Sequence, residues 1–259
     1  MSTKFKIFHK LLLFLNYRIT DRFVNYFYYK GNPPYFNPIY YWRLLYNKKC
    51  VSKLRENNEL WSILNTVCHT SSSTGCDYSD YYELYCIIKK LRPRYILECG
   101  SGISTCVIAL ALKEIYEEHG KKGTCVSVEE LPEYFNNLKA IIPLELKPFV
   151  ELQCCCRKEM KYGSLWGASY MDIPDYPYNF VFIDGPSQRK YPGAHKCFNS
   201  DYINVLKKVD FTVYGLLDQR ITTLRAFKKI IPSAEIRYSC IKKHTFISAN
   251  RTCIDELYV

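Results

Sequence analysis

The stretch Arg94-Tyr95-Ile96-Leu97-Glu98-Cys99-Gly100-Ser101-Gly102-Ile103-Ser104-Thr105 decides the fold of this chain. It begins with a short apolar run at 95–97, which predicts a buried strand. The segment Gly100-Ser101-Gly102 predicts a tight turn, and the apolar pattern from Ile103 to about Glu118 predicts a helix. A strand, a glycine turn and a helix in this order open a nucleotide-binding α/β unit.

The two glycines of this turn suit a close approach between the backbone and a ligand. Glycine lets the chain bend sharply and places no Cβ in the way. The helix that follows directs its unpaired N–H groups and the positive end of its dipole at the same place. Thr105 stands where the dinucleotide fingerprint G-x-G-x-x-G needs its third glycine, and no Gly-Lys-Ser/Thr is present to form a P-loop. The alternative is a glycine-rich turn of the kind that any α/β protein can contain.

Three motifs resemble those of the class I S-adenosylmethionine-dependent methyltransferases. Glu98-x-Gly100-x-Gly102 is similar to motif I of that family, and Val126-Ser127-Val128-Glu129 is similar to its second strand. The segment Tyr178-Asn179-Phe180-Val181-Phe182-Ile183-Asp184-Gly185-Pro186 resembles the fourth strand with its terminal aspartate. The resemblance covers roughly residues 77–250.

This resemblance implies S-adenosylmethionine as the cofactor and methyl transfer as the activity. It implies that Glu129 binds the ribose hydroxyls and that the adenine lies near Cys156 or Arg157, after the third strand. The residues that it places around the amino-acid portion of the cofactor are Glu98, Gly100, Gly102, Ser104 and Thr105.

Two acids end the strands expected to be fourth and fifth, Asp184 and Asp218. The carboxyl ends of parallel strands meet at one edge of a sheet, so both carboxylates should lie on one side of the cofactor's methyl group. They could hold a divalent cation that lowers the pKa of a substrate hydroxyl, or one could act as a general base without a metal. We favour the base, because Gln219 follows Asp218 where relatives with a D-G-P motif often carry an acid.

His195 follows the fourth strand and is a further candidate for the base, with a surface or capping histidine as the alternative. Arg189, Lys190 and Arg220 could bind an anionic substrate, although such side chains are usually solvated. Glycines near both ends of residues 185–194 suggest a mobile loop over the site.

From Asp77 onward the pattern alternates between strands and helices. This alternation predicts an α/β fold with a doubly wound, mainly parallel Rossmann-like sheet, and the resemblance implies an antiparallel C-terminal hairpin. Residues 157–177 read as irregular, because glycines and prolines interrupt them. The expected strands are 95–98, 124–129, 149–155, 178–183, 211–217, 234–241 and 244–249. The expected helices are 54–67, 79–93, 103–118, 132–141, 194–208 and 222–230.

We expect a basic, aromatic-rich helical N-terminal arm, 1–70, and a domain, 71–259. Residues 1–55 contain eleven Lys and Arg and one acid, Asp21, so they carry 11 − 1 = +10 of the total formal charge of +11. The remaining sequence is near neutral, which argues against a domain-wide surface for nucleic acid. The polar linker 70–75 is the expected boundary.

Within the arm, apolar and aromatic residues recur at intervals of three and four over residues 4–29, which predicts an amphipathic helix. A basic helix with a wide apolar face is typical of peripheral contact with a membrane, here through residues 1–30. Packing on its own domain or on a second subunit is an equal alternative. No signal peptide or membrane-spanning run is evident, so we expect a cytoplasmic protein that can associate with a membrane.

Thirteen cysteines are scattered along the chain without a C-x-x-C pair. Cys154, Cys155 and Cys156 are consecutive on a predicted strand, where neighbouring side chains point to opposite faces and cannot share a metal. Buried thiols in a reducing compartment are therefore favoured over a zinc site, and no metal ligand is assigned.

Together these features predict methyl transfer from S-adenosylmethionine to a small hydroxylated acceptor, and only the D-G-P resemblance suggests a sugar or glycan. The competing hypothesis is a catalytically inactive protein of this fold that docks to a membrane or a partner. The basic arm and Gln219 support that hypothesis. An enzyme that binds NAD or a sugar nucleotide is disfavoured by Thr105.

Overall fold

The computed structural model describes residues 38–71, 77–189 and 194–258. The chain divides into two compact units, residues 1–46 and 47–259, and most of the first lies outside the described residues. The predicted helix over residues 4–29, its membrane contact and most of the predicted linker at 70–75 also lie outside them. Within the described part of the chain, no helix has the length and apolar character needed to cross a bilayer.

Two N-terminal helices, α3 (Pro38–Glu56) and α4 (Asn58–Thr70), stand where a helix was predicted for residues 54–67. The break falls at Asn57, whose side chain accepts a hydrogen bond from the N–H of Leu60 and so starts a new helix. The apolar face of α4 is buried in the core of the second unit. That unit therefore begins before residue 71, the predicted start of the domain.

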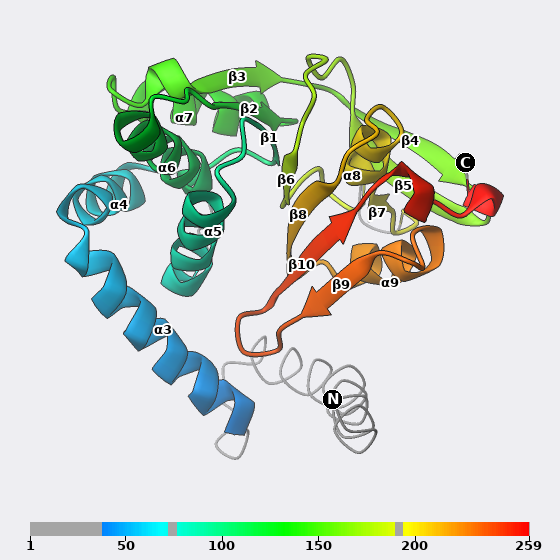
Figure 1. Cartoon of the computed structure of the whole chain (residues 1–259), viewed down its shortest axis with the longest axis horizontal. Helices are drawn as coiled ribbons and strands as arrows, with labels where there is room; N and C mark the ends of the chain where they lie inside the picture. The colour runs from blue at the N-terminus through cyan, green and yellow to red at the C-terminus, as the bar shows by residue number, and fades with distance from the viewer. Residues whose placement is uncertain (1–37, 72–76, 190–193, 259) are drawn as a thin grey trace. The chain divides into compact units, whose positions relative to one another are not determined.

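The second unit is built on a seven-stranded sheet. Its strands are β1 (Tyr95–Cys99), β2 (Thr124–Glu129), β3 (Val150–Cys154), β6 (Phe180–Ile183), β8 (Val213–Asp218), β9 (Glu235–Tyr238) and β10 (His244–Ala249). They lie in the order β3-β2-β1-β6-β8-β10-β9 (Figure 1). The first five in this order are parallel, and β10 is antiparallel to both of its neighbours. This confirms the predicted doubly wound, mainly parallel Rossmann-like sheet with an antiparallel C-terminal hairpin.

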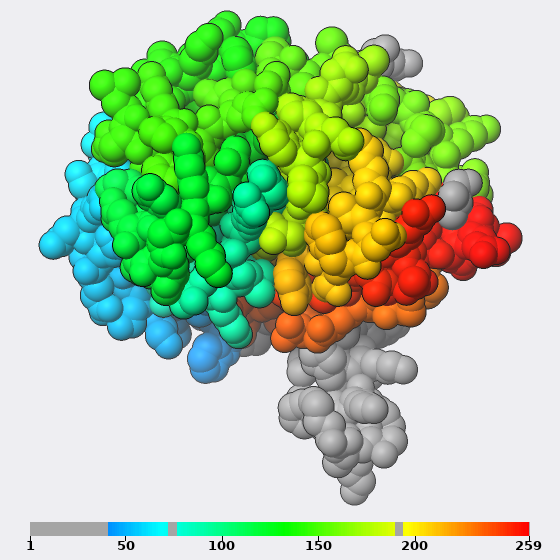
Figure 2. Space-filling model, turned by 45° about the horizontal axis from the view of Figure 1, so that its top comes forward, coloured from blue at the N-terminus to red at the C-terminus, as the bar shows by residue number. Residues whose placement is uncertain are grey.

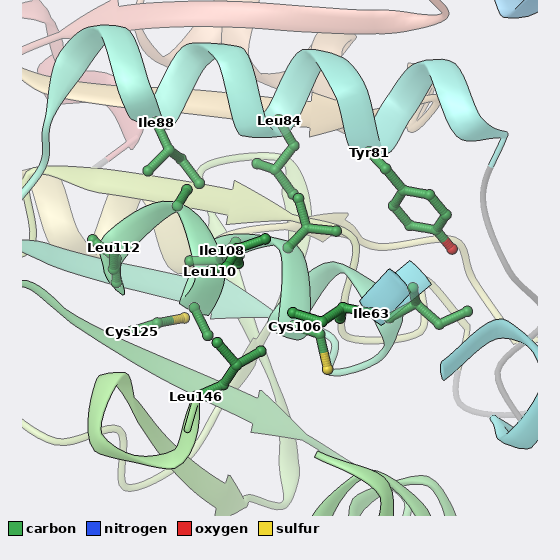
Figure 3. Packing of buried hydrophobic residues seen from close by; sticks show 14 of the residues in the cluster. Ile63, Tyr81, Leu84, Ile88, Cys106, Ile108, Leu110, Leu112, Cys125 and Leu146 are labelled. Atoms are coloured by element: carbon green, nitrogen blue, oxygen red, sulfur yellow. The ribbon is translucent and has the colours of Figure 1, made fainter. Parts of the chain in front are cut away.

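Helices cover both faces of this sheet, as parallel strands require. They are α5 (Tyr78–Leu91), α6 (Ile103–His119), α7 (Pro132–Ile141), α8 (Asp201–Leu206) and α9 (Ile221–Ile230). Figure 1 shows α4, α5 and α6 on one side and α8 and α9 on the other. In Figure 3, Leu84 and Ile88 of α5 point toward α6. Residues 106–112 of α6 are all fully buried, because the sheet covers one side of this helix while α4 and α5 cover another.

A second, three-stranded sheet follows the third strand of the main sheet. It consists of β4 (Arg157–Tyr162), β5 (Leu165–Tyr170) and β7 (Phe198–Asn199). The prediction that residues 157–177 are irregular is therefore wrong for the first part of that range. Gly163, which was interpreted as a breaker, has a φ of +56° and forms the hairpin turn between β4 and β5. The helix predicted over 194–208 begins only at Asp201, because β7 pairs with β5.

The C-terminal residues pack on this hairpin. A Cβ at Gly163 would lie 2.9 Å from the carbonyl oxygen of Leu257, in the 3-10 helix η4 (Glu256–Tyr258). Figure 2 shows the C-terminal segment, in red, beside the green segment that contains β4 and β5. The β4–β5 hairpin thus contacts the end of the chain as well as β7.

Candidate functional site

The loops after β1 and β6 meet at the carboxyl edge of the main sheet, where the strand order reverses. Gly100 has a φ of +96°, and a Cβ there would lie 3.0 Å from the carbonyl carbon of Asp184 and from the nitrogen of Gly185. A Cβ at Gly185 would in turn lie 2.7 Å from the nitrogen of Gly100 and would collide with the hydroxyl of Tyr170. Both positions therefore require glycine. Ligands of open α/β sheets bind at such a reversal point.

Glu98 is the penultimate residue of β1, and its carboxyl is fully buried. Its Oε1 accepts a hydrogen bond of 2.6 Å from the Ser104 hydroxyl, and its Oε2 accepts one of 2.6 Å from the Thr105 hydroxyl. Burial raises the pKa of Glu98 to about 7, although these hydrogen bonds oppose the shift. The three side chains thus hold the first turn of α6 against β1.

Glu129 ends β2, and its carboxylate binds the backbone of the glycine loop. Its Oε2 accepts a hydrogen bond of 3.2 Å from the N–H of Ser101, and its Oε1 accepts bonds from the N–H groups of Glu130 and Leu131. A carboxylate has about four acceptor positions, so roughly one remains for a ligand hydroxyl. The Ser101 hydroxyl is buried and has no partner among the described residues.

Asp184 and Asp218 come together as predicted. They follow Ile183 of β6 and end β8, and the register pairs Ile183 with Leu217. The Oδ1 of Asp218 is buried and has no partner among the described residues. Burial, followed by the charges of Asp184 and Asp80, raises the pKa of Asp218 to about 8.

The structure adds Asp80, from the first turn of α5, to these two acids. Its Oδ2 accepts a hydrogen bond of 3.2 Å from the N–H of Asp77, and its Oδ1 is buried without a partner among the described residues. Burial and the charge of Asp77 raise the pKa of Asp80 to about 7, and the charge of Asp184 adds to the shift. The sequence predicts only a helix over 79–93 at this place.

His244 is a second residue of this edge that the sequence analysis did not single out. It pairs with Asp218 across β10 and β8, and its Nδ1 is buried without a partner in the described structure. Burial, together with the charge of Lys242, lowers the pKa of His244 to about 4, so the imidazole stays neutral at physiological pH.

Arg220 anchors the loop after β6 instead of lying in solvent. Its Nη2 lies 3.1 Å from Oδ1 of Asp184, and its Nη1 donates a hydrogen bond of 3.0 Å to the carbonyl of Pro186. The side-chain amide of Asn199 donates a second hydrogen bond of 2.7 Å to that carbonyl. Farther along the loop, the N–H of Ser187 donates to the Glu130 carboxylate at 2.8 Å. Residues 184–187 are therefore held in a defined conformation.

His195, the predicted alternative base, lies with residues of the second sheet. Its Nε2 is 3.0 Å from Oε2 of Glu159, and its ring packs on Trp166 with 4.8 Å between ring centroids. The contacts of His195 in the described structure thus do not link it to Asp184 or Asp218.

Positive charges gather beyond this loop. Burial and the charges of Arg189, Arg225 and Arg220 lower the pKa of Lys196. Arg189 is exposed, whereas Arg220 is engaged with the loop. Lys190, the third predicted anion ligand, lies outside the described residues.

Comparison with known proteins finds distant structural likenesses only. No protein-family model matches the chain, and no curated protein sequence matches it significantly. The O-methyltransferase TomG of Streptomyces achromogenes, solved in complex with SAM, is 13% identical over 79% of this chain and 89% of its own, with a TM-score of 0.44. The O-methyltransferase of Bacillus cereus, in complex with SAH, is 17% identical over 76% and 89%, with a TM-score of 0.42. The SAH-bound methyltransferase PaMTH1 of Podospora anserina is 10% identical over 88% and 94%, with a TM-score of 0.44.

Proposed function

We propose that this chain is an S-adenosylmethionine-dependent methyltransferase that acts on a hydroxyl group of a small acceptor. The proposal rests on the arrangement of residues at the carboxyl edge of the main sheet. There the glycine loop, Glu129 and the pair Asp184 and Asp218 converge, and Oδ1 of Asp218 is buried without a partner among the described residues. The distant likenesses to solved structures do not enter this argument.

The residues of the edge suit this cofactor in charge and shape. Gly100 lets the loop after β1 pack directly against the backbone of Asp184 and Gly185, and this brings the two loops together where the amino-acid portion of the cofactor would lie. Glu129 has acceptor capacity for a ribose hydroxyl, and the unpartnered hydroxyl of Ser101 lies in the same loop. Glu98 acts as a positioning residue, because its two oxygens bind the start of α6. When bound, S-adenosylmethionine supplies an activated methyl group, so the protein has mainly to align the acceptor and exclude water.

Asp218 is the base in this proposal. A base works best when its pKa lies near the working pH, and the pKa of Asp218 is raised to about 8. Its unpartnered Oδ1 can accept the proton of the acceptor hydroxyl as the oxygen becomes the nucleophile, and the proton then passes to solvent. His195 is less suited, because its Nε2 is engaged by Glu159.

A general base is favoured over a divalent cation between Asp184 and Asp218. The guanidinium of Arg220 lies 3.1 Å from Oδ1 of Asp184, so this oxygen is already hydrogen-bonded and is not free to bind a cation. The same contact compensates the negative charge of Asp184. Asp218 is therefore the carboxyl that is available to react.

The acceptor that fits best carries several hydroxyl groups. Asp80 and Asp218 each keep a buried acceptor oxygen without a partner in the described structure, and each oxygen can bind one hydroxyl donor. A sugar or glycan offers such donors close together, and this supports the acceptor class suggested by the D-G-P motif.

Binding and turnover separate this function from its alternatives. Calorimetric titration of the full chain should give micromolar binding of S-adenosylmethionine and none of NAD. Glu129→Ala should weaken the binding, whereas the exposed control Glu145→Gln should not. Binding followed by methyl transfer to a hydroxylated acceptor supports the enzyme, and binding without transfer to any acceptor favours the inactive scaffold. Absence of S-adenosylmethionine binding refutes the proposal.

A peripheral membrane contact of residues 1–30 and a reducing cytoplasmic location complete the proposal. The charge of +10 within residues 1–55 supports the first, and the twelve free cysteines of the described residues are compatible with the second. Co-sedimentation with anionic liposomes, with and without residues 1–30, tests the contact. Equal sedimentation of both forms contradicts it.

A further inference from the structure

We propose that Glu159, His195 and Cys197 form a zinc-binding site next to the loop after β6. A carboxylate oxygen, an imidazole nitrogen and a thiol sulfur from these residues all lie within 4.8 Å of one another. Zinc sites with an open position have three protein ligands of these types, at about 2.0–2.3 Å from the ion. The proposal is independent of methyl transfer.

The pair distances and the burial of the three groups fit an ion between them. Nε2 of His195 is 3.0 Å from Oε2 of Glu159, and a shift of a few tenths of an ångström would give the roughly 3.3–3.6 Å between two tetrahedral zinc ligands at about 2.0–2.2 Å. Cys197 is fully buried, while Glu159 and His195 are partly exposed. The thiolate would therefore lie at the floor of the site, and the other two ligands would leave a path for the ion from solvent.

Arg157 supplies an independent indication of an anion at Cys197. Its side chain is only 7% exposed, and Nη2 is buried without a hydrogen-bond partner in the described structure. The guanidinium of Arg157 lies close to the Cys197 thiol. An unpaired buried donor next to a neutral thiol is unfavourable. A zinc-bound thiolate would satisfy it.

The surrounding residues orient the ligands in the way that metal sites require. Nη1 of Arg157 donates to Oε1 of Glu159 at 2.5 Å and leaves Oε2 for the ion. The indole of Trp166 packs against the ring of His195 and restricts its rotation. The ligand set also selects the ion, because sulfur and imidazole favour zinc over the oxygen-seeking magnesium.

A bound ion would tie the second sheet to the loop that carries Asp184. The N–H of Cys197 donates a hydrogen bond of 2.8 Å to the carbonyl of Gln188, and Nε of Arg157 donates one of 2.8 Å to the carbonyl of Ser187. Zinc would thus link these segments, with water in its fourth position, and its binding would release the thiol proton to solvent.

The test is titration of the metal-free full chain with Zn²⁺ in competition with a chromogenic chelator. Wild type should bind one ion tightly, and Cys197→Ser should lower the affinity at least about 100-fold. The matched control Cys154→Ser removes an exposed thiol and should bind as wild type does. The Co²⁺-loaded protein should show a thiolate charge-transfer band that Cys197→Ser lacks. Mg²⁺ should not compete.

Two further variants keep the test decisive if Cys197→Ser does not fold. Glu159→Gln and His195→Gln change partly exposed side chains and should also weaken Zn²⁺ binding. Failure of wild type to bind Zn²⁺ tightly overturns the proposal. Equal affinity in wild type and in the ligand variants overturns it as well, and so does a loss of binding in Cys154→Ser as large as in Cys197→Ser.

Discussion

Replacing Glu98 with glutamine makes the energetic consequence of a buried carboxyl measurable. Glu98 is fully buried, and burial raises its pKa from 4.5 to about 7. In the unfolded chain the same carboxyl ionises near 4.5. Between these two values the folded protein keeps a proton that the unfolded chain has lost, so the contribution of Glu98 to stability falls as the pH rises.

The interval from 4.5 to about 7 corresponds to roughly 3 kcal/mol of unfolding free energy, at about 1.4 kcal/mol for each pH unit. Glutamine does not titrate, so Glu98→Gln removes this part of the pH dependence. The unfolding free energy of the variant minus that of wild type should therefore rise by roughly 3 kcal/mol from about pH 4 to about pH 8. A constant loss from weaker hydrogen bonds to Ser104 and Thr105 cancels in this comparison.

Urea unfolding of both proteins at a series of pH values, followed by circular dichroism, gives the required free energies. Glu145→Gln is the matched control, because Glu145 is exposed, and it should follow wild type at every pH. A difference between Glu98→Gln and wild type that stays constant over the range would refute the reasoning. It would mean that Glu98 titrates alike in the folded and the unfolded chain.

Gly100→Ala should destabilise the protein by about 1–3 kcal/mol and abolish micromolar binding of S-adenosylmethionine, because the residue has a φ of +96° and lies against Asp184. Denaturant unfolding and calorimetry measure the two effects, and binding equal to wild type would contradict the role of the loop. Asp218→Asn should lower turnover of an identified acceptor by about 100- to 10,000-fold. Wild-type turnover should increase with pH up to about 8, as Asp218 loses its proton, and a flat profile would exclude it as the base. Phe227→Ala should cost about 3–5 kcal/mol in unfolding free energy, since the ring is fully buried against Tyr202, and Phe227→Leu should lose less; equal losses would show that the ring contact is unimportant.

Several elements could be predicted closely because their signals are local. The strand 124–129 and the helix 132–141 have the predicted bounds, and so does the closing strand 244–249. Each is a short apolar pattern next to a residue that starts or ends it, such as the proline at the first position of α7. Information of this kind lies within a few residues of the element itself.

The second sheet was missed because its pairing is not local. β7 has only two residues, and it is a strand because β5 lies beside it. Gly163 and Gly167 suggested an irregular segment, yet one forms a hairpin turn and the other lets Tyr162 approach within a strand. A glycine alone does not show which of these roles it has.

For the candidate site, the sequence by itself indicated which acidic residues lie at the ends of neighbouring strands. Asp184 and Asp218 could be placed together, because parallel strands share a carboxyl edge whatever their side chains do. Only the tertiary structure brought Asp80 to that edge and turned Glu98 toward α6.

The tertiary structure also decided the partners of charged groups. It paired Arg220 with Asp184, and it assembled Glu159, His195 and Cys197 from segments that are distant in the sequence. Secondary structure follows from patterns along the chain, whereas the partner of a side chain depends on packing between elements. The periodicity of a sequence does not show how these elements pack against one another.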